Sequence, residues 1–401
     1  MTKPRLSPGW VVVAACFIAM FGVWNSHAGF GVFLPVLSQE FGWSRGAISV
    51  AASINLLMGG IIASAVGAAS DRYGPRPILT LSALLAGAAF LLASAINALW
   101  HLYAVLGFMI GVGMSALYLV PTTTVSRWFV EQRGLALGIL LAGLNLAYVT
   151  GPPLSAFLIG AFGWRTAYLV LGGLAWVIAI PASQLTRLPP GAAGAHTARG
   201  GGGAAGTTFR KALWQRPLWL LFASWLLLGF AQMMLAIHTV PYVKDRGVSL
   251  EAASLALTIF GVATILGRLL LGAVADRLGA TPTFWFCQAL QFLTLTWLLA
   301  DPSLQVLYLL LAGFGFGVAG ADTAVVKAAT EAFAGPAVGA IMGILSFGWR
   351  CGAALGPAAA GFIYDATGSY TIAFGLASAG LVAGFALFTL AMSRLRPGAG
   401  R

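Results

Sequence analysis

The sequence contains very little charge for its length. Asp, Glu, Lys and Arg make up 8% of its 401 residues, whereas about 25% is usual in soluble globular domains. Acidic residues are the scarcer group, with 10 Asp and Glu against 22 Lys and Arg. A chain this poor in charge and 59% hydrophobic does not fit the class of soluble globular proteins, so we expect an integral membrane protein.

Cysteine is also scarce. Its three residues, Cys16, Cys287 and Cys351, are widely separated and lie inside apolar runs. Their spacing excludes a disulfide framework and a cysteine-based metal site. The loops are too short to hold a catalytic constellation or a signalling domain, so we expect neither an enzyme nor a receptor, and we expect no cofactor and no metal.

Long apolar runs occupy most of the chain. Runs of roughly 20 residues are long enough to cross about 30 Å of hydrocarbon as helices. The sequence contains twelve, at 10–34, 46–69, 77–97, 102–126, 134–160, 166–186, 217–242, 251–275, 282–300, 304–329, 337–363 and 370–393. They predict an all-α integral membrane protein with twelve transmembrane helices.

The basic residues are distributed unevenly between the predicted loops. With both termini inside, fifteen Lys and Arg fall in inner loops and tails and four in outer loops. This asymmetry is typical of cytoplasmic termini and an even number of spans. The net charge of +12 is therefore explained by topology. The basic residues are scattered over short loops and form no broad basic face, which argues against a nucleic-acid partner.

The chain divides into two related halves. Residues 188–217 are rich in Gly, Ala and Pro, which is typical of a flexible linker. "GAASDRYGPRP" at 67–77 matches "GAVADRLGATP" at 272–282 with an offset of 205 residues. We therefore expect two pseudo-symmetric six-helix bundles, 1–187 and 217–401, joined by a cytoplasmic linker, 188–216.

The repeated loop resembles the signature of the major facilitator superfamily. "RWFVEQRGLALGILLAG" at 127–143 and an Arg two-thirds along the predicted eighth span also resemble the monocarboxylate transporters and their bacterial relatives, including the oxalate:formate exchanger. One departure is Thr264, where the animal transporters have an Asp that takes part in proton coupling. The resemblance implies alternating access, a bacterial inner-membrane location and a functional monomer. It also implies a conformational latch formed by Gly67, Asp71, Arg72, Gly74, Arg76, Asp276 and Arg277. The alternative is a pair of basic loops that only set the topology.

Three ionisable residues lie well inside predicted spans, where an unpaired charge is costly. We expect Arg268 and Arg350 to bind substrate, because an Arg fork donates two parallel hydrogen bonds to a carboxylate. Backbone-paired structural cations are the alternative. Asp322 is the candidate proton-coupling residue, since burial favours its neutral acid while nearby arginines favour its carboxylate. It could instead form a structural ion pair with either Arg. Lys327 is nearer the cytoplasmic end and stands four residues before Glu331, which favours snorkelling or a local helix pair.

Four polar residues complete the predicted substrate site. Tyr118 resembles the cavity tyrosine of bacterial monocarboxylate transporters, although core packing would also suit it. His238 resembles a pocket position of the family and could equally line the outer vestibule. Asn145 stands opposite Arg350 in the repeat, and Asn25 is a further amide within a span. Asn55, Tyr148 and Gln232 are secondary candidates that could simply join helices.

The residues favour secondary active transport of a small organic anion. Arg268, Arg350 and Asp322 together carry one net positive charge, which a monocarboxylate such as lactate or pyruvate would neutralise. Proton-coupled symport is the function that we favour, with a small carboxylate, protons and the lipid bilayer as partners. An oxalate-type dicarboxylate exchanger is the alternative. A drug exporter is less favoured, because it would prefer an apolar or acidic cavity.

Overall fold

The computed structural model describes residues 7–129, 132–190, 209–333 and 338–395. Within these ranges every regular element is a helix. The chain groups into two compact units, unit 1 with residues 1–42 and 54–202, and unit 2 with residues 43–53 and 203–401. Each unit is built around long apolar helices, as the sequence predicts.

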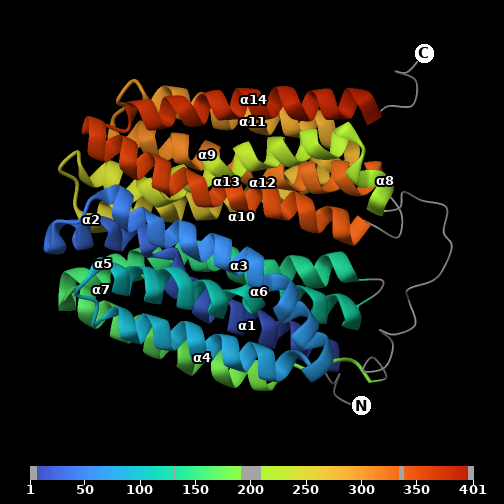
Figure 1. Ribbon diagram of the computed structural model, residues 1–401, viewed down its shortest axis with the longest axis horizontal. Coiled ribbons are helices and arrows are strands. Elements are labelled where there is room, and N and C mark those ends of the chain that lie inside the picture. Colours follow the sequence, from blue (N-terminus) through green and yellow to red (C-terminus); the bar gives the residue numbers. More distant parts are fainter. Residues whose placement is uncertain (1–6, 130–131, 191–208, 334–337, 396–401) are drawn as a thin grey trace, which may run out of the picture. The chain divides into compact units, whose positions relative to one another are not determined.

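Unit 1 contains the helices of the first half of the chain (Figure 1). α1 and α4 both pack against α7, and α4 also packs against α6. The elements are α1 (Pro8–Ala28), α2 (Phe30–Phe41), most of α3 (Arg45–Tyr73), α4 (Pro75–Ala93), α5 (Leu99–Leu102), the π-helix η1 (Tyr103–Met109), α6 (Ile110–Trp128) and α7 (Arg133–Gln184).

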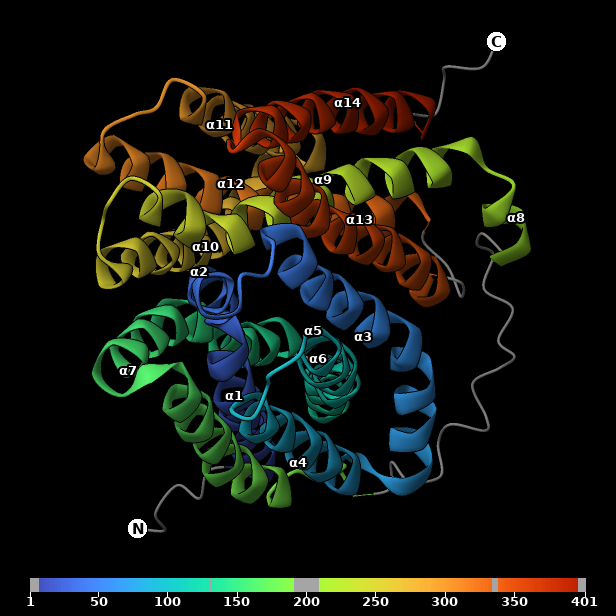
Figure 2. The same cartoon turned by 60° about the vertical axis from the view of Figure 1, so that its left-hand side comes forward.

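α7 comprises two membrane passes. Its 52 residues would extend about 78 Å as a straight helix, more than twice the hydrocarbon thickness. Gly163 interrupts it with φ of 79°, a conformation that glycine adopts readily. Figure 2 shows the two arms that meet at this break.

Unit 2 contains the helices of the second half together with the first turns of α3. α9 packs against α13 and α14, while α10 packs against α12. The elements are α8 (Phe209–Leu213), α9 (Arg216–Lys244), α10 (Leu250–Leu278), α11 (Ala280–Leu298), α12 (Leu304–Ala332), α13 (Val338–Thr367) and α14 (Thr371–Leu395).

The described helices account for the twelve expected spans. Ten stretches are long and apolar enough to cross a membrane, with α1 and α2 joined in one stretch. One of the ten, Leu135–Gln184, contains both arms of α7. The remaining span is α11, which is 19 residues long and carries Gln288 and Gln291 among its apolar residues. The prediction of an all-α membrane fold is confirmed.

The backbone repeats with the same offset of 205 residues as the sequence motif. Every positive-φ glycine in the described ranges has a partner at that spacing: Gly42 (66°) with Gly247 (77°), Gly74 (85°) with Gly279 (91°), and Gly163 (79°) with Gly368 (69°). Glycine is favoured at these positions because a Cβ is strained there. The two halves therefore turn their chain at equivalent points.

Two segments differ from the expected division of the chain. Residues 43–53 were expected in the first bundle, and they group with unit 2 because their polar groups bond to α9, α13 and the α13–α14 turn. Of the expected linker, 188–216, residues 191–208 lie outside the described residues. Its end forms the short helix α8 where a flexible chain was expected.

Candidate functional site

Glycines bring α10 and α12 into backbone contact in unit 2. A Cβ added to Gly267 would lie 2.5 Å from the carbonyl oxygen of Phe316, closer than any real side chain can approach. Three residues before Gly267, Thr264 donates its hydroxyl to the carbonyl of Gly315 at 3.2 Å. Small residues allow this close packing in membrane helices. The contact places Arg268, which follows Gly267, beside the polar part of α12.

Asp322 on α12 is the centre of the polar group formed there. Trp225 Nε1 of α9 donates to Asp322 Oδ1 at 3.3 Å. Arg268 of α10 acts on the carboxyl electrostatically, but the ion pairs found among the described residues do not join the two. Asp322 is only partly buried. The structure thus places a carboxyl and an arginine close together within the membrane span without a direct salt bridge.

Gln232 of α9 connects this group to α13. Its side chain is 2% exposed, and its Oε1 accepts a hydrogen bond from Trp349 Nε1 at 2.9 Å. Gln232 also interacts with Asp322, although its Nε2 completes no hydrogen bond of regular geometry. Arg350 follows Trp349 on α13 and is partly buried. The three ionisable candidates therefore lie on helices of one unit.

The remaining amide and tyrosine candidates belong to unit 1. Asn25 is buried and donates through Nδ2 to the hydroxyl of Thr150 at 2.5 Å, which joins α1 to α7. Asn145 is buried on α7, with 7% of its surface exposed, whereas Tyr118 on α6 is 40% exposed. Tyr118 is therefore accessible on its own unit, while Asn25 already has a protein partner.

His238 is held on both sides of its ring in unit 2. It is completely buried. Nε2 lies 2.8 Å from the carbonyl oxygen of Pro357 and 3.2 Å from Ser49 Oγ, and Nδ1 lies 2.9 Å from the hydroxyl of Tyr370. A carbonyl can only accept, so Nε2 carries the proton and Nδ1 accepts from Tyr370. Both nitrogens are occupied by the protein, so the geometry favours a positioning role over substrate contact.

Arg45 at the start of α3 forms a cluster that the sequence did not suggest. Its Nη1 and Nη2 donate to the two Asp245 oxygens at 2.8 and 2.6 Å, and Nη1 also donates to the Tyr370 hydroxyl at 2.9 Å. The guanidinium lies 3.9 Å from the centre of the Tyr364 ring. Burial raises the pKa of Tyr370, and the Arg45 charge acts against that rise. We call these residues, with Asp365, the Arg45 cluster.

Asp365 completes the Arg45 cluster by capping α3. Its two oxygens accept the backbone N–H groups of Arg45 and Gly46 at 2.9 and 2.8 Å. These donors would otherwise lack partners at a helix start. Sequence separations of 320 and 319 residues explain why local patterns could not reveal the cap.

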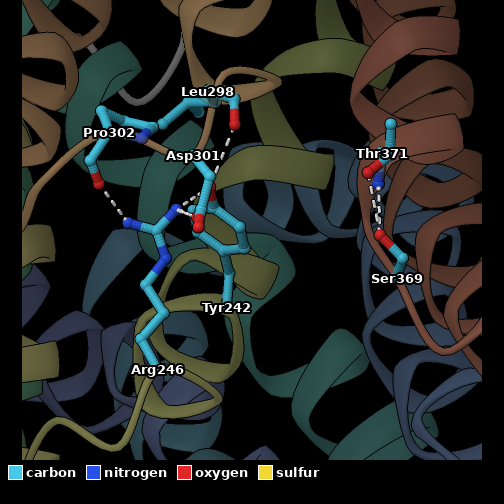
Figure 3. Close-up of polar contacts among 7 residues, drawn as sticks. All are labelled: Tyr242, Arg246, Leu298, Asp301, Pro302, Ser369 and Thr371. Atoms are coloured by element: carbon cyan, nitrogen blue, oxygen red, sulfur yellow. Dashed lines mark hydrogen bonds and ion pairs between the residues drawn. The ribbon is translucent and has the colours of Figure 1, made fainter.

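A second group of contacts, which we call the Arg246 brace, joins the loops at the same end of unit 2 as the Arg45 cluster (Figure 3). Arg246 pairs with Asp301 and donates to the carbonyl of Pro302, and its guanidinium lies 4.5 Å from the centre of the Tyr242 ring. Tyr242 in turn donates to the carbonyl of Leu298 at 3.1 Å. Figure 3 also shows Ser369 accepting the N–H of Thr371 at the start of α14. The brace fixes the α11–α12 loop on the end of α9.

The expected latch residues lie at the opposite ends of α3 and α10. In unit 1, Arg127 of α6 pairs with Asp71 at 2.5 Å, and Arg76 donates to Gln184 at 2.7 Å. Gly74 supplies the turn with φ of 85°, Gly67 packs near Leu119, and Arg72 stacks on Tyr73. Asp71 therefore contacts a cation that a neighbouring helix carries, and Asp276 in unit 2 does the same.

In unit 2, Lys327 pairs with Asp276 at 2.8 Å. Lys327 also lies 3.7 Å from Glu331, so the expected local helix pair is confirmed, and Asp276 is a second and closer partner. Arg277 is exposed. The repeat thus preserves an aspartate-to-cation contact at the end of both α3 and α10.

Comparison with known proteins agrees with this architecture. The family model described as Major Facilitator Superfamily matches residues 12–254 and 235–401. Monocarboxylate transporter 13 of Rattus norvegicus is 28% identical over 94% of this chain and 87% of its own length. Monocarboxylate transporter 2 of Homo sapiens is 25% identical over 90% of this chain and 80% of its own length.

A bacterial relative shows the same extent of similarity. The uncharacterized MFS-type transporter YcxA of Bacillus subtilis is 28% identical over 92% of this chain and 91% of its own length. The family model and these relatives span almost the whole sequence, and the relatives are named as transporters. The chain therefore belongs to the major facilitator superfamily and is a membrane transporter rather than an enzyme.

Proposed function

We propose that this protein is a secondary active transporter that carries a small monocarboxylate, such as lactate or pyruvate, together with a proton. The observation that carries the proposal is the close packing of α10 on α12, which brings Arg268 near the titratable carboxyl of Asp322 without an ion pair between these two described residues. The names of the relatives, several of which are monocarboxylate transporters, support the substrate class.

Arg268 is the proposed anchor for the substrate carboxylate. A guanidinium offers two parallel donors that match the two carboxylate oxygens, and it keeps its charge at any relevant pH. Its partial exposure leaves it accessible, and the absence of an Asp322 salt bridge within the described residues leaves donors available. Arg350 is the proposed second cation.

Asp322 is the proposed proton carrier. Trp225 and Arg268 both favour its carboxylate form, whereas its position in a membrane span favours the neutral acid. Such opposed influences allow its protonation to respond to substrate charge and to pH. Thr264 stands where animal relatives have their coupling Asp, and its hydroxyl is bonded to Phe260 and Gly315, so Asp322 takes over the coupling role in this chain.

We propose that Tyr118, Asn145 and Asn25 also bind the substrate. Tyr118 combines an accessible ring with one hydroxyl, which suits a short apolar chain that ends in a polar group. Asn145 supplies a neutral hydrogen-bonding group, and Asn25 supplies its side-chain oxygen, because only its Nδ2 is bonded to Thr150. We leave His238 outside the binding set because both of its nitrogens have protein partners.

The topology that accompanies this proposal follows the distribution of basic residues. Both termini are cytoplasmic, the chain acts as a monomer in a bacterial inner membrane, and the Asp71 and Asp276 loops latch the cytoplasmic ends of their units. The orientation would be tested by introducing a cysteine at Arg165, in a predicted outer loop, or at Arg277, in a predicted inner loop, and labelling it from each side of the membrane. Labelling of an Arg165→Cys variant from the cytoplasm would contradict it.

The proposal is tested by counterflow in proteoliposomes. Vesicles loaded with unlabelled lactate should accumulate labelled lactate, and external pyruvate should compete while a lipophilic cation should not. Accumulation that depends on oxalate or formate and does not depend on lactate would favour the alternative of anion exchange. The second cation, Arg350, supports that alternative. Proton-coupled monocarboxylate uptake is electroneutral, whereas exchange of a dianion for a monoanion carries current.

A further inference from the structure

Unit 1 has a shallow groove between the start of α4 and the end of α7. One hollow of about 340 Å³ is lined by Arg76, Pro77, Thr80, Leu81, Leu84 and Gln184. A second hollow of about 530 Å³ shares Arg76, Pro77 and Gln184 and continues to Tyr73, Val11 and the segment 185–188. The two hollows form one groove with a basic end and an apolar end.

We propose that this groove binds an anionic phospholipid, with the headgroup phosphate at the basic end and an acyl chain along α4. The proposal concerns a lipid site and is independent of the transported substrate. It rests on the charge of the lining, on the hydrogen bonds that orient Arg76, and on the depth of the exposed leucines.

The basic end is electrically one-sided. Arg76 and Arg187 both line it, and neither lining set contains Asp or Glu. Among the described residues, neither Arg has a carboxylate within ion-pair distance. Both side chains are exposed. Two cations without acidic neighbours attract a phosphate, as basic pockets beside membrane helices do for lipid headgroups.

A hydrogen-bond network orients the Arg76 guanidinium. Arg76 Nε donates to Gln184 Oε1 at 2.7 Å, and Gln184 Nε2 donates to Thr80 Oγ1 at 2.7 Å. Thr80 and Ser183 hydroxyls lie 2.8 Å apart. Because the protein uses only Nε in this network, the Nη groups of Arg76 remain for a ligand of the groove that this residue lines. The segment that carries Arg187 is fixed by Trp128 Nε1, which donates to the Arg187 carbonyl at 2.7 Å.

The apolar end lies deeper along the same helix. Leu81 and Leu84 are 54% and 41% exposed, and they follow Arg76 by about 8 and 12 Å along α4 at 1.5 Å per residue. Arg76 is the second residue of α4, at the end of the span Pro75–Ala93 that adjoins the turn from α3, the level at which headgroups lie. A phosphate at Arg76 therefore directs an acyl chain over both leucines, which a free phosphate would leave uncovered.

The test is lipid binding to the detergent-solubilised full chain, measured by native mass spectrometry with phosphatidylglycerol, phosphatidylcholine and glycerol phosphate. We expect phosphatidylglycerol to bind tighter than phosphatidylcholine. Each of Arg76→Gln and Arg187→Gln should weaken phosphatidylglycerol about fivefold, the effect of one basic residue at an anionic surface. The control is Arg165→Gln, which removes an exposed cation paired with Glu40 elsewhere in unit 1 and should bind as wild type.

A second variant tests the acyl chain separately. Leu84→Trp fills the apolar end and keeps both cations, so it should weaken phosphatidylglycerol while leaving any glycerol phosphate binding unchanged. Equal binding of the two lipids, or wild-type affinity in Arg187→Gln, would overturn the proposal. Glycerol phosphate binding as tightly as phosphatidylglycerol would show a free-anion site and would overturn the lipid assignment.

Discussion

Trp225 donates its indole N–H to Asp322 across 3.3 Å, joining α9 to α12 between residues 97 positions apart. The bond is longer than the usual 2.9–3.0 Å of an N–H···O contact. It therefore holds the carboxyl in place with a modest interaction. A carboxyl held in this way can change partners when it gains a proton or when a substrate anion reaches Arg268.

Replacing Asp322 by Asn should remove proton coupling and leave the fold intact. Asn keeps the size of the side chain and mimics the neutral acid, so the charge of the site no longer depends on pH. Wild-type uptake of labelled lactate should rise as the external pH falls, because an inward proton gradient drives symport. The variant should exchange lactate across the membrane without this rise.

The pH dependence should be compared at equal amounts of reconstituted protein. Glu251→Gln is a suitable control, since Glu251 is an exposed acid in the first turn of α10. A pH profile of Asp322→Asn that coincides with the wild-type profile would remove Asp322 from the coupling step.

Replacing Gly267 by Ala should destabilise unit 2. The added methyl would overlap the Phe316 carbonyl, so α10 and α12 would have to separate, and such overpacking costs about 1–3 kcal/mol. Gly272→Ala is a matched control on the same helix, because a Cβ there meets open space. Thermal unfolding in detergent should give a lower Tm for Gly267→Ala alone. Equal Tm values for the two variants would refute the close approach.

Replacing Tyr370 by Phe should weaken the attachment of the first turns of α3. The hydroxyl accepts from Arg45 and donates to His238, and loss of a buried partner costs about 1–3 kcal/mol. Tyr73→Phe is the control, because Tyr73 is 61% exposed. Hydrogen exchange of residues 43–53 should speed up in Tyr370→Phe and stay unchanged in the control. Unchanged exchange in both variants would contradict the bridging role of the hydroxyl.

The sequence predicted the membrane class, the spans and the repeat because each has a local signal. Apolar length marks a span, and the Asp-Arg loop marks the equivalent turns that Gly74 and Gly279 make. Arg268 and Asp322 could be selected because a charge inside an apolar run is rare. The sequence left open a direct ion pair between Arg268 and Asp322. The ion pairs of the described residues do not include it.

The contacts that depend on tertiary packing could not be predicted. No neighbour in sequence distinguishes Arg45 from other loop cations, because its partners Asp245 and Tyr370 lie 200 and 325 residues away. His238 suggested a pocket residue by resemblance, yet Pro357, Ser49 and Tyr370 occupy its ring nitrogens. No local spacing encodes which distant groups meet, so only the fold reveals whether a polar residue is available.

The most direct test of the account is uptake of labelled lactate by proteoliposomes that contain the Arg268→Gln variant, with Arg394→Gln as the control at an exposed site in the last turn of α14. A charge-assisted hydrogen bond contributes about 1.5–3 kcal/mol, so we expect uptake by Arg268→Gln to fall at least about tenfold. Lactate should also no longer raise its Tm, while the control behaves as wild type. Wild-type uptake and a wild-type lactate-induced Tm shift in a folded Arg268→Gln protein would contradict the central role of Arg268.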